Sequence, residues 1–91
     1  MTVVWREPAL ADLERIDQWL DSFESGKPEA TRKKIGAAIA LLERLGDIGR
    51  PGRVAGTREI AVRKAPYLIA YQIVDDVIEV LAVYHMAQDR S

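Results

Sequence analysis

The chain has 91 residues, enough for one domain whose core removes roughly 60–65% of the unfolded chain's surface from water. Its 48% apolar and 30% charged residues are typical of a folded globular protein and exclude a disordered chain. Cysteine is absent, which excludes disulfides and thiolate metal sites and agrees with a reducing compartment. The early apolar runs are too short and too charged for a signal peptide or a membrane span, so we expect a cytoplasmic protein without membrane association.

The net charge of −1 argues against a dedicated nucleic-acid binder, but the charges are unevenly distributed. Residues 1–31 carry seven acids against three bases, residues 32–64 nine bases against three acids, and residues 65–91 four acids against one base. The basic middle third has two interpretations. It is either a solvated helix face followed by a basic loop, or an electrostatic contact surface for an acidic partner or target.

The first half of the chain predicts a strand and a helical hairpin. Residues 2–6 are rich in β-forming residues, and Pro8 suits the first turn of a helix. A helix is predicted from Pro8 to about Phe23, because apolar residues recur there at steps of three and four: Leu10, Leu13, Ile16, Leu20 and Phe23. Its outer face is expected to carry Asp12, Glu14, Arg15 and Asp21. The break at residues 25–28 is short, which favours an antiparallel second helix.

The second helix is predicted from about Pro28 to Leu45, with Gly46 as its stop. Its main apolar stripe comprises Ile35, Ala38, Ile39, Leu42 and Leu45. Ala37 and Leu41 widen this stripe, and small residues at 36–38 and 40 permit close approach of another backbone. The widened face indicates either a two-sided contact with the core or a surface that receives a segment of a partner.

The second half predicts a glycine-rich loop followed by a three-stranded meander. Three glycines and a proline in residues 47–56 forbid a helix or a central strand. Residues 57–63, 67–74 and 77–84 read as strands whose short connections make them antiparallel neighbours. In the first, Ile60 and Val62 are expected on the buried face, opposite Glu59. The later strands are apolar on both faces, so helices should cover one face and something else the other.

These elements predict an α+β fold of order β-α-α-β-β-β. The helical hairpin should pack on one face of an antiparallel sheet. The expected core residues are Leu13, Ile16, Leu20, Ile39, Leu42, Ile60, Ile69 and Leu81.

Several stretches of the second half resemble the RelE/ParE toxin superfamily. The sequence GRPGRVAGTRE at residues 49–59 is similar to the family's glycine-rich loop running into a strand. PYLIAYQI at 66–73 resembles its central strand, and IEVLAVYH at 78–85, followed by QDR at 88–90, resembles its last strand. The likeness covers nearly the whole chain. It implies a single RelE/ParE-like domain over residues 1–91, with the fold order predicted above.

Two activities are established in this superfamily, messenger RNA cleavage on the ribosome and inhibition of DNA gyrase by the ParE branch. Metal-free RNA cleavage needs groups that activate the 2′-hydroxyl, stabilise phosphorane charge and protonate the leaving oxygen. By resemblance, an arginine of the nucleases falls near Leu68 and a terminal tyrosine falls at Met86, and neither residue can perform these tasks. A non-enzymatic gyrase inhibitor is therefore the leading hypothesis. The alternatives are a RelE-type mRNA endonuclease, with His85, Arg58 and Arg63 as catalytic candidates, and a non-toxic binding module on the same fold.

The candidates for contact with a target or antitoxin are Arg50, Arg53, Arg58, Arg63, Tyr67, Tyr71, His85 and Arg90. Arg58 shares strand parity with Ile60, so it is expected to point inward and to pair with an acid such as Glu79. His85 has either a structural role at the strand end or a role in target contact or acid–base chemistry. The aromatic residues Trp5, Trp19, Tyr67 and Tyr71 are expected in the core or packed on the sheet rather than as stacking platforms.

The resemblance also implies a partner. Toxins of this group are inactivated by an antitoxin whose C-terminal segment folds along the hairpin and sheet. We therefore expect a ParD-like antitoxin in an even-numbered hetero-oligomer, with DNA gyrase as the target. No cofactor or metal is expected, and direct nucleic-acid binding stays open.

Overall fold

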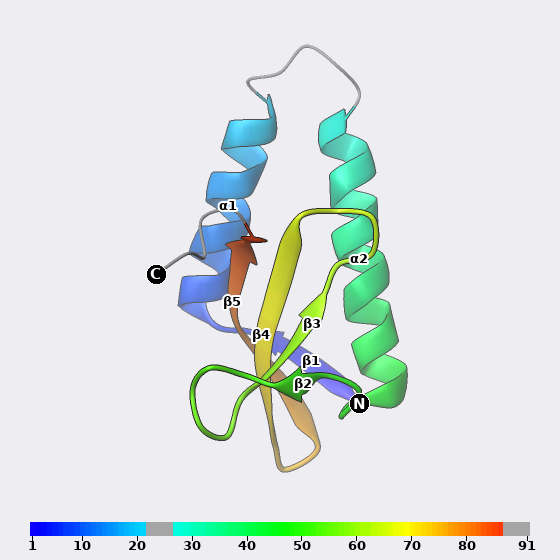
Figure 1. Cartoon of the computed structure of the whole chain (residues 1–91), viewed down its shortest axis with the longest axis vertical. Helices are drawn as coiled ribbons and strands as arrows, with labels where there is room; N and C mark the ends of the chain where they lie inside the picture. Colours follow the sequence, from blue (N-terminus) through cyan, green and yellow to red (C-terminus); the bar gives the residue numbers. More distant parts are fainter. Residues whose placement is uncertain (22–26, 87–91) are drawn as a thin grey trace.

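The computed structural model describes residues 1–21 and 27–86 of the chain. These residues form two helices and five strands, shown in Figure 1, in the order β1 Thr2–Trp5, α1 Glu7–Asp21, α2 Lys27–Leu45, β2 Arg50–Pro51, β3 Arg58–Ala61, β4 Tyr67–Val74 and β5 Val77–His85. The predicted α+β fold is confirmed. The two helices run along the long axis of the molecule, and α1 packs on β5.

The strands form one sheet in the order β1-β5-β4-β3-β2. Strands β3, β4 and β5 are antiparallel neighbours, as predicted. The short β2, which lies in the predicted glycine-rich loop, also pairs antiparallel with β3, and β1 pairs in parallel with β5, so the sheet is mixed. No tight turn connects β1 to β5, and a parallel pairing is therefore open to it. The short β2 contains Pro51, which an edge strand tolerates because its outer side needs no ladder hydrogen bond.

The helical hairpin begins and ends close to the predicted residues. Gly46 ends α2 with a φ of 62°, and its N–H donates to the Leu42 carbonyl at 2.8 Å, an arrangement that favours glycine. Arg32 of α2 ties the two helices together by donating to the Asp17 and Asp21 carboxylates at 2.6 and 2.9 Å. The hydrogen bond to Asp17, followed by that to Asp21, raises the pKa of Arg32.

No helix in the described ranges is long and apolar enough to span a bilayer. Phe23 and Gly26 lie outside these ranges.

The core lies between the hairpin and one face of the sheet. It contains Ala9, Ile35, Ala38, Leu42, Val62, Tyr67, Ile69, Tyr71, Ile78, Val80 and Val83. Of the expected core residues, Leu20, Leu42 and Ile69 are buried, and Leu13, Ile16, Ile39 and Ile60 pack partly buried against the cluster. Leu81 was predicted wrongly and is only half-buried. The register passes from Ala70↔Ala82 to Tyr71↔Val80, so Leu81 is the extra residue of a β-bulge.

The buried stripe of α1 is rotated from the predicted one. Ala9 is fully buried, whereas Leu10 is 49% exposed, so the stripe begins one residue earlier than expected. Asp12, predicted on the outer face, is half-buried and accepts a hydrogen bond from the Val83 N–H at 2.9 Å. Asp12 therefore provides an acceptor for a backbone N–H of β5 that lies beyond Val80, the last residue of β5 that pairs with β1. Trp19, expected in the core or packed on the sheet, is a 53% exposed residue that lies outside the core and packs edge-on against His85 of β5.

Truncation of the core should separate buried from exposed leucines of the same helix. Leu42→Ala is expected to lower the free energy of unfolding by about 2–5 kcal/mol, because Leu42 is fully buried. Leu45→Ala, at a 52% exposed position, is expected to change it by only about 0.5 kcal/mol. Urea unfolding of both variants tests the assignment. Equal losses would contradict this placement of the core.

Candidate functional site: the basic loop and the second face of the sheet

The basic loop, residues 46–57, is attached at its start to the central strand β4. The buried Tyr71 hydroxyl accepts a hydrogen bond from the Gly49 N–H at 2.8 Å and donates one to the Gly46 carbonyl at 2.9 Å. A Cβ at residue 49 would lie 2.6 Å from the Tyr71 oxygen, so this approach requires glycine. Burial raises the pKa of Tyr71, which keeps the hydroxyl protonated as a donor.

Arg58 reinforces the same attachment from β3. It lies opposite Tyr71 in the ladder and is half-buried, which agrees with its predicted inward parity. Its guanidinium donates to the Asp47 and Gly49 carbonyls at 3.3 and 3.1 Å. The predicted pairing of Arg58 with Glu79 is wrong, because strand alternation places Glu79 on the opposite face of the sheet.

Glu79 instead joins two other side chains. Its carboxylate accepts a hydrogen bond from Gln72 Nε2 at 2.7 Å and forms an ion pair with Arg6. The hydrogen bond from Gln72, and then that from Arg6, lower the pKa of Glu79. Gln72 and Glu79 are register partners on β4 and β5. Their hydrogen bond therefore joins these two strands near the Asp75–Asp76 turn, and the ion pair with Arg6 links β5 to the segment that follows β1.

Glu59 is the one charged residue that is buried among the described residues, although it was expected on the exposed side of its strand. The basic loop folds back over it. The Glu59 carboxylate accepts hydrogen bonds from Arg53 Nε at 3.2 Å and the Arg53 N–H at 3.3 Å, and the Arg50 guanidinium lies 4.0 Å away. Arg50 and Arg53, both candidates for contact with a target or antitoxin, are exposed, but the folded loop uses both to compensate a buried charge.

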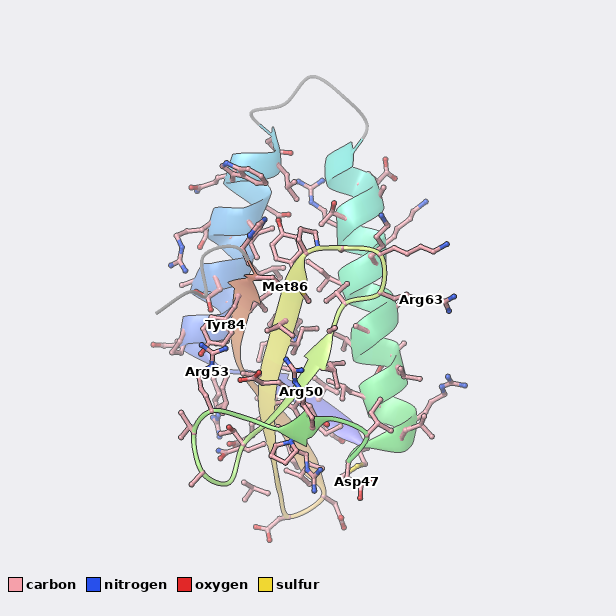
Figure 2. All side chains as sticks on the ribbon, viewed as in Figure 1. Asp47, Arg50, Arg53, Arg63, Tyr84 and Met86 are labelled. Carbon is pink, nitrogen blue, oxygen red and sulfur yellow. The ribbon has the colours of Figure 1, made fainter. Side chains whose placement is uncertain are left out.

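The face of the sheet turned away from the core, here called the second face, carries Glu59, Leu68, Ala70, Ala82 and Tyr84. The Arg53 guanidinium stacks over the Tyr84 ring at 4.9 Å from its centroid, and Tyr84 is the ladder partner of Leu68. Figure 2 shows Arg53 and Tyr84 close together, with Arg63 on the other side of the molecule beside α2. Sequence reasoning did not single out Tyr84. Its alternation with the buried Val83 was the available signal.

The three residues considered for RNA cleavage are not brought together. His85 packs its ring edge-on against Tyr67 and Trp19, with centroid separations of 5.3 and 6.2 Å. Its ladder partner Tyr67 is four residues along β4 from Tyr71, the partner of Arg58, which is about 13 Å of strand. Arg63 follows the end of β3 and is exposed. No group of three potential metal ligands occurs in residues 1–21 and 27–86.

The other residues considered for partner contact or for packing differ in how far their side chains are exposed. Tyr67 and Tyr71 are 2% and 0% exposed, so a partner cannot reach either ring without opening the fold. Trp5 packs partly buried against the core, as expected for a structural aromatic residue. Arg90 lies outside the described residues.

The comparisons with known proteins agree with this architecture. The family model described as "ParE toxin of type II toxin-antitoxin system, parDE" matches residues 3–90. The chain belongs to this family. It is also 34% identical over 84 residues to a protein of Sinorhizobium fredii named "Putative toxin Y4kP", a match that covers 92% of this chain and 86% of the relative.

Solved structures of the superfamily share the fold. A chain of the chromosomal ParDE system from P. aeruginosa superposes with a TM-score of 0.71 at 22% identity, covering 93% of this chain and 95% of that one. The isolated E. coli RelE toxin gives a TM-score of 0.68 at 18% identity, covering 99% of this chain and 86% of that one. A chain of the Mycobacterium tuberculosis RelBE2 complex gives 0.60 at 27% identity, with 92% and 95% covered. This ParE-family toxin therefore has the fold common to both branches.

Two of the candidate arginines, Arg53 and Arg63, should differ in their effect on the free energy of unfolding. Arg53→Ala is expected to lower the free energy of unfolding by about 1–2 kcal/mol, because it removes a hydrogen-bond donor from the buried Glu59. Arg63→Ala, which leaves no buried carboxylate behind, is expected to change it by no more than about 0.5 kcal/mol. Thermal unfolding at one pH and ionic strength compares the two. An Arg53→Ala variant as stable as Arg63→Ala would show that Glu59 does not depend on the loop.

Proposed function

We propose that this ParE-family toxin inhibits DNA gyrase without acting as a nuclease, and that a ParD-like antitoxin neutralises it. The family assignment supports a toxin of a type II system. The choice of gyrase comes from the resemblance to the ParE branch and from the chemistry of the second face. The protein would meet both partners in the cytoplasm.

The observation that carries the proposal is the pairing of Arg50 and Arg53 with the buried Glu59. A site that stabilises a phosphorane needs positive groups aimed at the developing charge. Here a carboxylate lies between the two guanidiniums, and its negative charge would repel a phosphate at the same place. The neighbouring Leu68 offers no charge at all. The second face is therefore better suited to protein contact than to phosphoryl chemistry.

Relatives of known structure support the antitoxin part of the proposal. The E. coli RelBE and M. tuberculosis RelBE2 structures are toxin–antitoxin complexes by their descriptions. An antitoxin that binds the folded toxin would also stabilise it by mass action. Antitoxins of this group commonly dimerise, so we propose an even-numbered assembly.

The alternative function is RelE-type mRNA cleavage. The likeness to isolated RelE over 99% of this chain keeps this alternative open, because the fold alone does not distinguish the branches. Against it stands the separation of Arg58 and His85 along β4 and the packing of His85 among aromatic rings.

Two parallel assays decide between these functions. The purified toxin is expected to inhibit gyrase supercoiling and to leave mRNA intact in a ribosome assay. Addition of the antitoxin is expected to restore supercoiling. Site-specific mRNA cleavage that His85→Ala abolishes, in a variant that still unfolds cooperatively, would overturn the gyrase assignment and make His85 catalytic. A toxin that affects neither assay would indicate a binding module instead.

A further inference from the structure

The end of the basic loop, residues 52–57, forms a closed turn that we call the loop tip. The Gly52 N–H donates to the Thr57 carbonyl at 2.8 Å, and the Thr57 N–H and hydroxyl donate to the Val54 carbonyl at 3.1 and 2.6 Å. Gly56 has a φ of 83°, as the third residue of a type II turn does, and this conformation favours glycine. The backbone of the loop tip is therefore ordered by contacts within the loop itself.

Arg53 attaches the loop tip to the second face of the sheet. Its backbone N–H and its guanidinium donate to the buried Glu59 carboxylate, and the guanidinium also stacks over the Tyr84 ring. Figure 2 shows Arg50 and Arg53 on the same stretch of loop, with Arg53 directed toward Tyr84. Val54 follows Arg53 directly, so its backbone is held by Arg53 on one side and by the turn on the other.

The side chain of Val54 is exposed on this ordered turn. At 60% it is the most exposed large hydrophobic residue within residues 1–21 and 27–86. Single exposed apolar residues are common on protein surfaces, but the fold gives this one no role. Val54 belongs neither to the core cluster nor to the hydrophobic residues packed against it. Turns are dominated by Gly, Pro, Asn, Asp and Ser, so the local backbone does not account for a valine either.

Arg50 adds a positive charge to the same loop. Its guanidinium lies 4.0 Å from the Glu59 carboxylate, farther than the 3.2 Å of Arg53, and its side chain is 68% exposed. Arg50 is therefore held loosely and can reach a carboxylate of another molecule. Figure 1 shows the segment between β2 and β3 as a loop that extends away from the strands. The basic loop thus presents an apolar side chain and an accessible guanidinium on a protruding, ordered element.

We propose that Val54 is an anchor that inserts into an apolar pocket of the target protein, and that acidic residues at the rim of this pocket pair with Arg50. The inference rests on the proposed function for the identity of the target, DNA gyrase, but the chemistry of the pocket comes from the loop. Oppositely charged groups around an apolar contact would also orient the two proteins as they meet.

The shape and rigidity of the loop tip favour a folded target over other partners. A protruding element that is already ordered fits a preformed concave site and loses little conformational entropy on binding. A disordered segment that folds on binding instead wraps around the surface of its partner. A nucleic acid would pair its phosphates with the arginines and leave Val54 without an apolar contact.

Substitution of the anchor tests the proposal. Val54→Asp removes the apolar side chain and places a negative charge against the acidic rim, whereas a turn accepts aspartate readily. We expect the toxin concentration that half-inhibits gyrase supercoiling to rise by about tenfold or more, while the temperature of thermal unfolding does not fall. Val54→Ile, which keeps a β-branched apolar side chain, should recover most of the inhibition that Val54→Asp loses.

Leu10→Asp is the matched control. Leu10 is 49% exposed in the first turn of α1, in the helical layer on the other side of the sheet, and a helix accepts an acid there. We expect this variant to change the half-inhibitory concentration by less than about twofold. Equal losses in Val54→Asp and Leu10→Asp would contradict a specific role for Val54.

Photo-crosslinking identifies what the anchor contacts. The chain has no cysteine, so Val54→Cys provides a single thiol for a benzophenone maleimide. Irradiation of the labelled toxin with gyrase and DNA is expected to join the label to a gyrase site that contains apolar and acidic residues. Labels joined to DNA would overturn the protein pocket in favour of a nucleic-acid contact, and a gyrase site without acidic residues would contradict the pairing of Arg50.

The outcomes separate this inference from the proposed function. If the unsubstituted toxin inhibits gyrase and Val54→Asp inhibits it equally well, the anchor is overturned and the proposed function stands. If the unsubstituted toxin does not inhibit gyrase, both are overturned. Antitoxin binding is measured in parallel, and Val54→Asp is expected to retain it. Loss of antitoxin binding together with gyrase inhibition would assign the loop tip to the antitoxin instead.

Discussion

The buried Tyr71 hydroxyl is the interaction on which the arrangement of the basic loop depends. It bonds the Gly46 carbonyl and the Gly49 N–H at once, and Arg58 satisfies the carbonyls of Asp47 and Gly49 beside it. The chain leaving α2 is thereby attached to the middle of the sheet. Because both partners of the hydroxyl are buried, losing it would leave unpaired polar groups in the interior.

Two surfaces of opposite character follow from this attachment. On the second face, the loop returns over Glu59 and brings Arg53 against Tyr84, so its arginines are partly neutralised by the fold. On the other side, β2 ends its pairing at Glu59, and the edge at Ala61 stays open beside α2. The cations there, Lys34, Arg44, Arg63 and Lys64, form no ion pair with an acid within the described ranges. Arg53 therefore helps to stabilise the fold, whereas Arg63 remains a candidate only for contact with a partner or target.

Periodicity and turn residues were sufficient to predict the order of the elements, the bounds of β4 and the stop at Gly46. They could not predict features that depend on contacts between distant segments. Leu81 was misplaced because a bulge interrupts the alternation of β5, and Glu59 was misplaced because a loop, not solvent, covers its side of β3. The candidate arginines could be named from the charge distribution of the sequence, but the pairing of Arg50 and Arg53 with Glu59 became visible only in the fold.

Amide hydrogen exchange at Gly49 tests most directly the claim that the basic loop is anchored rather than free. The Gly49 N–H donates to a buried hydroxyl, so it should exchange as slowly as the amides of the central strand, and much more slowly than Ala55 at the exposed tip of the loop. In Tyr71→Phe, which keeps the ring and removes the acceptor, this protection should disappear while that of Ile69 persists. A Gly49 amide that exchanges as fast as Ala55 in the unsubstituted toxin would contradict the account.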